Sequence, residues 1–245
     1  MEDKEIYLCS LVEKDHFFYR VRRDIVRSWL QKIFPQKNST PLVVEAGSGT
    51  GIMIEELGED YEAFGSDLFF DPGISLPVNR FIRADVCRMP FADNMADAAL
   101  ALDLIEHLPD DLAGLQEIAR ITKPGGYVFI NVPALPLLWS DWDQAVGHQR
   151  RYKKQAMQKL IKDAGLETIL LHYANSLPFF PILIYRWFRS TFGVGKKQRL
   201  EDRVPPQLIN RILYWAFFQE GTKKWVSLPF GGSLFAVLRK KSGNN

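Results

Sequence analysis

A glycine-rich turn at residues 45–51 is the first part of the sequence that could do chemistry. It reads Glu-Ala-Gly-Ser-Gly-Thr-Gly, follows a short apolar stretch and precedes an expected helix at 52–58. Glycine adopts positive φ easily and lets a ligand approach the backbone, and a helix start offers free N–H groups. An ordinary tight turn would use the same glycines, so the turn alone does not identify a ligand.

Two details of this turn favour one class of ligand. A dinucleotide fingerprint would place Gly or Ala three positions after the second glycine, and Ile52 stands there. The carboxylate of Glu45 would repel a pyrophosphate, whereas it suits a ligand that carries a sulfonium and an ammonium group.

Acidic residues also follow the next three expected strands, at Asp67, Asp85 and Asp103. A carboxylate at the end of the second strand can accept hydrogen bonds from both hydroxyls of a ribose. Asp85, with the backbone of Val86, is placed to meet an adenine. A lone Asp at a strand end more often caps a helix, but four acidic strand ends in succession make independent capping a poor explanation.

These residues need a frame of alternating strands and helices. Apolar stretches predict strands at 42–44, 63–66, 80–84, 98–102, 127–132, 166–173 and 233–238, with helices between most of them. Such alternation is typical of a mostly parallel sheet that binds ligands at the carboxyl ends of its strands. The sequence therefore predicts a doubly wound α/β fold.

Together with the stretches 103–108 and 123–126, these motifs resemble the class I S-adenosylmethionine-dependent methyltransferases of the type 11 or type 12 kind. The resemblance covers about residues 40–175 and the last strand. It implies a Rossmann-like sheet of seven strands with an antiparallel last strand, S-adenosyl-L-methionine as cofactor and S-adenosyl-L-homocysteine as product. The residues expected to line the cofactor site are Glu45, Ala46, Gly47, Gly49, Asp67, Leu68, Asp85, Val86, Asp103, Tyr19 and Arg20.

The segments 16–23, 132–140 and 147–152 carry a looser resemblance. They look like a bacterial branch of these enzymes whose members often accompany genes for cell-surface polysaccharides or glycolipids. This resemblance suggests a saccharide or a lipid-linked molecule as the methyl acceptor.

The segment after the fifth expected strand is dense in reactive side chains. His148 is the first candidate for a general base, because histidine titrates near neutrality, and Asp143 is the second. A base is needed only if the acceptor must lose a proton. The residues expected to contact the acceptor are His107, Trp139, Arg151 and Tyr152. A purely structural loop, with its tryptophans in the core and its arginines in solvent, remains an equal alternative.

Three functions stay open at this point. The leading one is in-line methyl transfer from S-adenosylmethionine to a small-molecule or glycolipid acceptor. A non-catalytic S-adenosylmethionine-binding regulator or partner subunit would need the same cofactor residues. A nucleotide-dependent oxidoreductase is disfavoured by Ile52 and Glu45.

Composition narrows the partners and the compartment. The net charge of +2, from 31 basic and 29 acidic residues, lacks the basic excess of a dedicated nucleic-acid binder. The two cysteines show no metal-ligand spacing, so no metal is expected, and they fit a reducing compartment. No signal peptide and no apolar run long enough to span a bilayer are visible. These features predict a cytoplasmic protein.

Residues 1–245 are expected to form a single domain, as a monomer or homodimer. Its predicted parts are a helical lid at 11–34, a sheet core at 40–173 and 233–240, and a helical insertion at 174–232. The insertion is too long for a structureless loop. It is expected to line the acceptor pocket, with peripheral contact to the inner face of the membrane as the less favoured reading.

Overall fold

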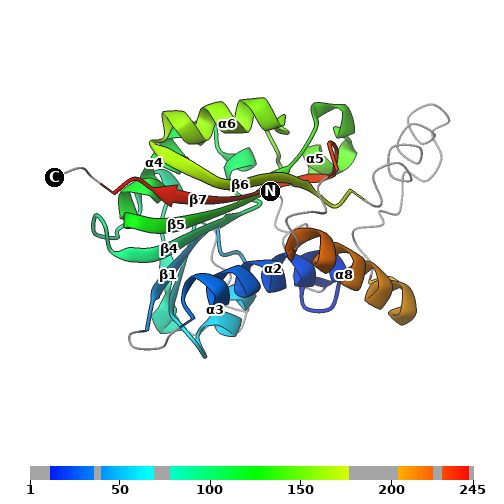
Figure 1. Cartoon of the computed structure of the whole chain (residues 1–245), viewed down its shortest axis with the longest axis horizontal. Coiled ribbons are helices and arrows are strands. Elements are labelled where there is room, and N and C mark those ends of the chain that lie inside the picture. The colour runs from blue at the N-terminus through cyan, green and yellow to red at the C-terminus, as the bar shows by residue number, and fades with distance from the viewer. Residues whose placement is uncertain (1–11, 36–39, 69–77, 177–203, 223–227, 243–245) are drawn as a thin grey trace.

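A mixed sheet of seven strands forms the centre of the molecule (Figure 1). The computed structural model describes residues 12–35, 40–68, 78–176, 204–222 and 228–242. The strands are β1 (Leu42–Ala46), β2 (Glu62–Asp67), β3 (Phe81–Arg83), β4 (Ala96–Leu102), β5 (Thr122–Pro133), β6 (Leu166–Ala174) and β7 (Ser233–Lys240). Their order is β3-β2-β1-β4-β5-β7-β6. β1 to β5 pair in parallel, and β7 is antiparallel to both β5 and β6. The predicted fold, with its antiparallel last strand, is confirmed.

Helices cover both faces of this sheet. They are α2 (Phe17–Ile33), α3 (Ile52–Leu57), α4 (Asp111–Ile121), α5 (Asp141–Ala145), α6 (Lys154–Asp163) and α8 (Gln207–Thr222). Four short 3₁₀ turns are η1 (Val78–Arg80), η2 (Val86–Arg88), η3 (Ile105–His107) and η4 (Pro136–Leu138). α2, α3 and α8 lie on one face and α4 and α6 on the other (Figure 1).

The strands alternate their side chains between two apolar clusters, as the two-residue period of a strand requires. Val43, Leu100 and Phe129 face α2 and α3, whereas their neighbours, such as Val44 and Ile130, face α4 and α6. All five side chains are fully buried. Complete burial of one such side chain stabilises the folded state by roughly 1.5–3 kcal/mol. This packing fixes the carboxyl ends of β1, β2 and β4 at one edge of the sheet.

Two element boundaries differ from the sequence-based prediction. α4 ends at Ile121, and β5 begins directly after it at Thr122, five residues before the strand expected at 127–132. The strand accommodates the Pro-Gly-Gly stretch through a register shift against β4 between Ala96 and Ala98. Within the predicted helix at 11–34, the continuous helix α2 begins only after His16. The His16 side chain caps this helix, since it accepts a hydrogen bond from the Phe18 N–H at 3.2 Å.

α2 and α8 lie side by side although about 190 residues separate them (Figure 1). The Tyr214 hydroxyl donates to the Asp24 carboxylate at 2.7 Å, and the Phe17 N–H donates to the Asn210 side chain at 2.8 Å. α8 is therefore a helical part of the predicted insertion that is docked on the N-terminal helix. Residues 177–203 and 223–227, the rest of that insertion apart from its flanking ends, lie outside the described residues.

α8 also presents apolar side chains to solvent. Leu208, Ile212 and Trp215 are 71%, 57% and 65% exposed. Among the described residues, no helix combines the length and the apolar character that crossing a membrane would require.

Candidate functional site

The glycine turn after β1 is tied to the end of β2. Gly47, Gly49 and Gly51 all have positive φ, and the N–H groups of Gly47 and Ser48 donate to the Ser66 carbonyl at 2.7 and 3.1 Å. A Cβ atom at Gly47 would lie 2.6 Å from the Leu104 side chain. Both the backbone angle and this close approach require glycine there.

Asp67 closes the same turn from the side of β2. Its Oδ2 accepts a hydrogen bond from the Gly49 N–H at 2.8 Å, and Leu68 after it is half exposed. The structure therefore brings together the glycine turn and the acidic strand end that the sequence placed 18 residues apart.

Glu45, the penultimate residue of β1, is buried. Its Oε2 is buried without a hydrogen-bond partner among the described residues. Burial raises the pKa of Glu45 to about 8, and the nearby Arg22 counteracts only part of this effect. The side chain is an acceptor that the surrounding protein leaves unsatisfied.

Asp103 joins the end of β4 to two neighbouring elements. It forms an ion pair with Arg22 of α2, and its Oδ1 accepts from the Asn131 side chain of β5 at 2.6 Å. Asp103 adopts a positive φ of 54°, which is uncommon for a residue with a side chain. Arg22 and Asn131 also line a small pocket of about 20 Å³, room for about one water molecule.

The side chains that α2 brings to this region differ in part from the predicted ones. Arg20 lies over the ring of Tyr214 in α8, 5.0 Å from its centroid, and so points toward α8. The guanidinium carbon of Arg22 lies over the ring of Tyr19, 5.8 Å from its centroid. Arg22, which was not predicted, is the α2 side chain that reaches the strand ends. A charged residue inside the apolar stripe of this helix is the signal that could have identified it.

Asp85 caps the short turn η2, since its Oδ1 accepts from the Cys87 N–H at 2.9 Å. Its carboxylate remains exposed to solvent, while Val86 beside it is buried. The capping that the sequence could not exclude for a single Asp is thus present here, whereas Asp67 and Asp103 bind other elements.

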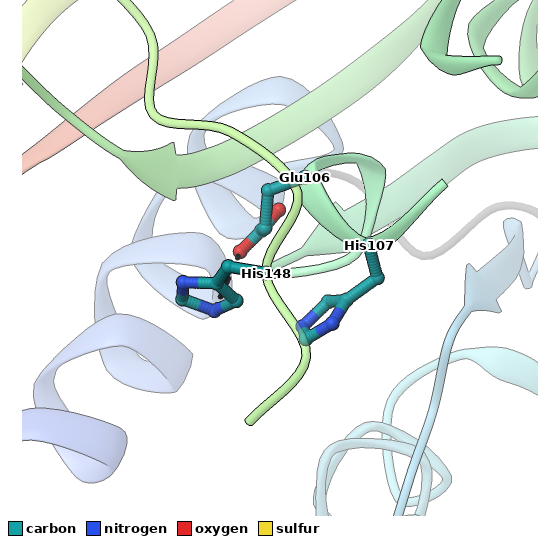
Figure 2. Close-up of side chains that lie close together, drawn as sticks. All are labelled: Glu106, His107 and His148. Carbon is teal, nitrogen blue, oxygen red and sulfur yellow. Dashed lines mark ion pairs between the residues drawn. The ribbon is translucent and has the colours of Figure 1, made fainter. Parts of the chain in front are cut away.

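A second polar cluster follows β4 (Figure 2). Glu106 is fully buried, and both of its carboxylate oxygens lack a hydrogen-bond partner among the described residues. The Nε2 atom of His148 lies 3.8 Å from its Oε1, and the rings of His107 and His148 meet edge to face at 4.7 Å. Burial raises the pKa of Glu106 well above its ordinary value, and burial, together with His148, lowers the pKa of His107 to about 4.

Asp143 holds His148 in this cluster. Its Oδ1 lies 2.9 Å from His148 Nδ1 and 2.7 Å from Arg151 Nε, and its Oδ2 accepts from the Ser140 N–H at 2.8 Å. Burial opposes ionisation of Asp143, but the hydrogen bonds from His148 and Arg151 outweigh it and lower its pKa to about 2. Asp143 is a fully buried carboxylate that orients His148.

The other residues predicted to contact an acceptor have different surroundings. Tyr152 is buried and donates to Asp111 at 2.8 Å, while burial and Asp111 raise its pKa. Arg151 donates to the Ala134 carbonyl as well as to Asp143. Trp139 is 39% exposed. His107 and His148 come together, and Arg151 and Tyr152 brace the segment that carries them.

The comparison with protein families decides the class of this chain. The model of a family described as a methyltransferase domain matches residues 18–171 of the 245. The chain belongs to this family. The match contains the glycine turn, Asp67, Asp85, Asp103 and the cluster around His148, and it confirms the predicted family.

Individual relatives agree with this assignment. The demethylmenaquinone methyltransferase of Corynebacterium urealyticum is 37% identical over 101 residues, which cover 38% of this chain and 44% of that protein. The chain spans about half the length of the curated relatives it matches.

Solved structures share the fold at low identity. A chain from the complex between the Haloferax volcanii Trm112 methyltransferase activator and a methyltransferase has a TM-score of 0.62, with 17% identity, 99% of this chain and 97% of that chain covered. A SAM-dependent methyltransferase of Archaeoglobus fulgidus has a TM-score of 0.54, with 14% identity, 89% of this chain and 94% of that chain covered.

Proposed function

We propose that this methyltransferase domain transfers the methyl group of S-adenosylmethionine to a small-molecule acceptor. Two observations carry the proposal together: the Asp67 carboxylate accepts from the Gly49 N–H at 2.8 Å, and the buried Glu45 has an Oε2 atom without a hydrogen-bond partner among the described residues. S-adenosylmethionine is the cofactor: it brings a ribose for Asp67 and positive charge toward Glu45. S-adenosylhomocysteine is the product.

The remaining cofactor contacts follow from the strand ends. Gly47 and Gly49 border the methionine part of the cofactor, because neither carries a side chain that would block it. The exposed Asp85 and the backbone of Val86 meet the adenine. Asp103, held by Arg22, stands at the end of β4, the strand that pairs with β1 and its glycine turn. α2 covers the turn from above and serves as the lid.

Methyl transfer from a sulfonium is an in-line displacement, so alignment is the main task of the protein, and orientation supplies roughly 7–11 kcal/mol. The acceptor oxygen forms the new C–O bond while the electrons of the S–C bond stay on sulfur. His148 accepts the proton of an acceptor hydroxyl, and Asp143, at 2.9 Å from His148 Nδ1, stabilises the resulting imidazolium.

The finer part of the proposal is a saccharide or lipid-linked acceptor. The exposed apolar face of α8, with Leu208, Ile212 and Trp215, supports a partner with an apolar part. The protein would then work in the cytoplasm, with peripheral contact to the membrane. The relative from C. urealyticum acts on demethylmenaquinone by its name, but it matches over only 101 residues and gives no acceptor for this chain.

Calorimetric titration with S-adenosylmethionine and S-adenosylhomocysteine tests the cofactor assignment. Asp67→Ala should weaken both ligands about 100-fold, or about 2.8 kcal/mol, because the ribose loses a charge-assisted acceptor. Asp163→Ala is the matched control, since Asp163 pairs only with the exposed Lys159 in the described structure. Normal binding by Asp67→Ala, or equal binding of NAD by the wild type, would contradict the proposal.

Transfer of labelled methyl groups to separate soluble and lipid fractions of a cell extract then tests the activity and the acceptor class. Label in the lipid fraction supports the lipid-linked acceptor, and label in the soluble fraction alone excludes it. Tight cofactor binding without labelling of either fraction would favour a non-catalytic binding subunit.

A further inference from the structure

Three side chains with metal-binding atoms converge just after β4: Glu106, His107 and His148 (Figure 2). We infer that they form a site for a divalent transition-metal ion. One ligand atom from each residue lies within 4.8 Å of the other two, and Glu106 Oε1 and His148 Nε2 are 3.8 Å apart. Ligand atoms around a tetrahedral ion stand roughly 3.3 Å apart, so small side-chain rotations close the site.

Glu106 is the independent observation that points to a cation. Its side chain is 0% exposed, and neither carboxylate oxygen has a hydrogen-bond partner among the described residues. A buried carboxylate in this state is costly unless a charge compensates it. The nearby arginines form their ion pairs with other carboxylates, Arg22 with Asp103 and Arg151 with Asp143, and neither donates a hydrogen bond to Glu106. A metal ion between Glu106 and the two imidazoles would satisfy both oxygens.

His148 also has the outer partner that a metal-binding histidine requires. His148 Nδ1 faces the Asp143 carboxylate at 2.9 Å. A carboxylate only accepts hydrogen bonds, so Nδ1 donates, and in the neutral imidazole Nε2 then carries the lone pair that can bind an ion. Partners of this kind fix the tautomer and the orientation of metal-binding imidazoles.

The ligand set selects the kind of ion. Two imidazoles and one carboxylate suit zinc, manganese, iron or cobalt, whereas magnesium and calcium prefer oxygen ligands alone. Three protein ligands leave at least one coordination position for another molecule, as in catalytic zinc sites. The site is therefore built to bind an exchangeable oxygen ligand.

This inference rests on the proposed function for what that ligand is: a hydroxyl oxygen of the acceptor. A hydroxyl bound to the ion loses its proton to solvent at a lower pH than the same hydroxyl free in water, because the cation stabilises the alkoxide. The alkoxide lone pair forms the C–O bond, and the electrons of the S–C bond remain on the thioether sulfur. In the metal-bound protein, His148 is a ligand through Nε2, and the ion replaces it as the group that promotes loss of the hydroxyl proton; in the metal-free protein His148 keeps the role of base given under the proposed function.

Calorimetry on protein stripped with EDTA tests the site directly. Zn²⁺ and Mn²⁺ should each bind with one equivalent per chain, and Mg²⁺ more weakly. Glu106→Gln should weaken Zn²⁺ binding more than 100-fold, and Asp143→Asn, which acts through His148, should weaken it 10- to 100-fold. His16→Asn is the matched control: it changes one of the other two histidines, keeps a capping side chain at the start of α2, and should bind Zn²⁺ normally.

A measurement on the wild type guards against variants that fail to fold. In nitrogen-15 NMR, Zn²⁺ should shift the ring nitrogens of His107 and His148 and leave those of His16 and His172 in place. The inference is overturned if the wild type binds no equivalent of Zn²⁺ or Mn²⁺, if Glu106→Gln binds Zn²⁺ normally, or if Zn²⁺ shifts only His16 or His172. S-adenosylmethionine binding at Asp67 would persist in each of these cases, so the two proposals fail separately.

Discussion

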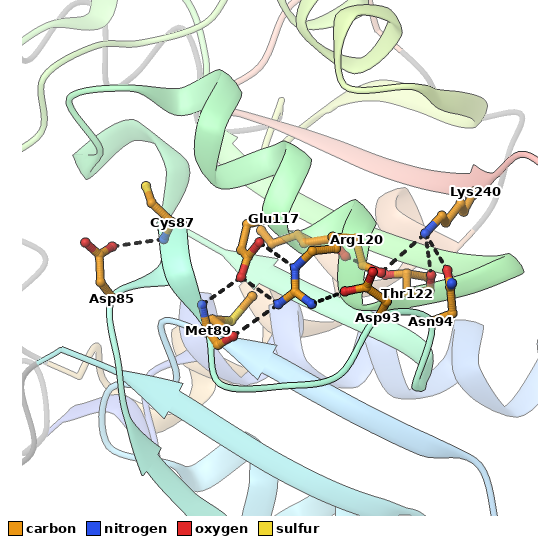
Figure 3. A network of polar contacts seen from close by, with 10 residues as sticks. Asp85, Cys87, Met89, Asp93, Asn94, Glu117, Arg120, Thr122 and Lys240 are labelled. Carbon is orange, nitrogen blue, oxygen red and sulfur yellow. Dashed lines mark hydrogen bonds and ion pairs between the residues drawn. The ribbon is translucent and has the colours of Figure 1, made fainter.

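Two polar networks stand at opposite ends of β4 and differ in how completely they are paired. At the amino end, Arg120 donates to Glu117 twice at 2.7 Å, to Asp93 at 2.5 Å and to the Met89 carbonyl at 3.1 Å (Figure 3). Lys240 donates to Asn94 and to backbone carbonyls beside it. Within the described part of the chain, no side-chain atom of this network is buried without a partner.

At the carboxyl end, buried atoms of Glu45, Ser48, Ser66 and Glu106 have no partner among the residues that the structure describes. Buried polar groups are nearly always hydrogen-bonded in folded proteins. These buried, unpartnered atoms lie at the two sites for which we propose ligands, whereas the network at the amino end of β4 is bonded within the chain.

The largest effect on stability is expected at the amino end. Arg120→Met keeps much of the aliphatic stem but removes the charge-assisted hydrogen bonds to Glu117 and Asp93, so the free energy of unfolding should fall by about 2 kcal/mol. Thermal melting measures this loss, and calorimetry should find cofactor affinity unchanged. A variant that melts like the wild type, or one that binds S-adenosylmethionine poorly, would contradict the idea that the amino end of β4 serves stability and the carboxyl end serves binding.

Glu45→Gln should raise the free energy of unfolding, in contrast to Arg120→Met. The folded pKa of Glu45 is about 8, whereas the unfolded value is about 4.3. Between these values the folded protein holds the extra proton, so the contribution of Glu45 to stability falls as pH rises through this window. The variant should therefore equal the wild type near pH 4 and become progressively more stable than the wild type as pH rises toward 8.

Melting curves of both proteins across that pH range give the comparison, and calorimetry should show weaker S-adenosylmethionine binding by the variant. A constant difference in stability at every pH would show that Glu45 does not titrate in this range.

The smallest effect is expected at Lys123, which pairs with Asp97 at 2.6 Å but is 44% exposed. Lys123→Ala should change the free energy of unfolding by no more than about 0.5 kcal/mol, because exposed ion pairs contribute little. Urea denaturation of both variants compares this loss in the free energy of unfolding with the loss in Arg120→Met. Equal losses in the two variants would mean that the number of hydrogen bonds made by Arg120 is not what stabilises the amino end.

The fold was accessible from the sequence because its signals are local. The apolar stretches of β1, β4 and β5 and the glycines at 47–51 indicate strands and a turn without reference to distant residues. The position of α8 against α2 was not accessible. It depends on contacts such as that of Tyr214 with Asp24, which no spacing along the chain indicates.

The candidate site divides in the same way. Asp67 was expected beside the glycine turn, and it lies there, since two neighbouring parallel strands bring their ends together. Arg22 was not predicted at the strand ends, because one helical position turns a side chain by about 100° and decides which element it meets. A role of Tyr19 and Arg20 in cofactor binding stays a prediction. Glu106 was missed as a separate site because nothing in its neighbours shows that its carboxylate is buried and unpaired.

The place of β7 between β5 and β6 bears on how the chain assembles. β6 pairs only with β7 in the described sheet. The contacts of α2 with Tyr214 and Asn210 can form only after α8 has been synthesised. During synthesis, residues 42–103 emerge early and can order β1, β2 and β4 around the glycine turn. β5 and β6 meanwhile present open edges, which invite pairing with other chains. The nascent protein thus passes through an interval in which the strands around the glycine turn can form while β5 and β6 still need protection from aggregation.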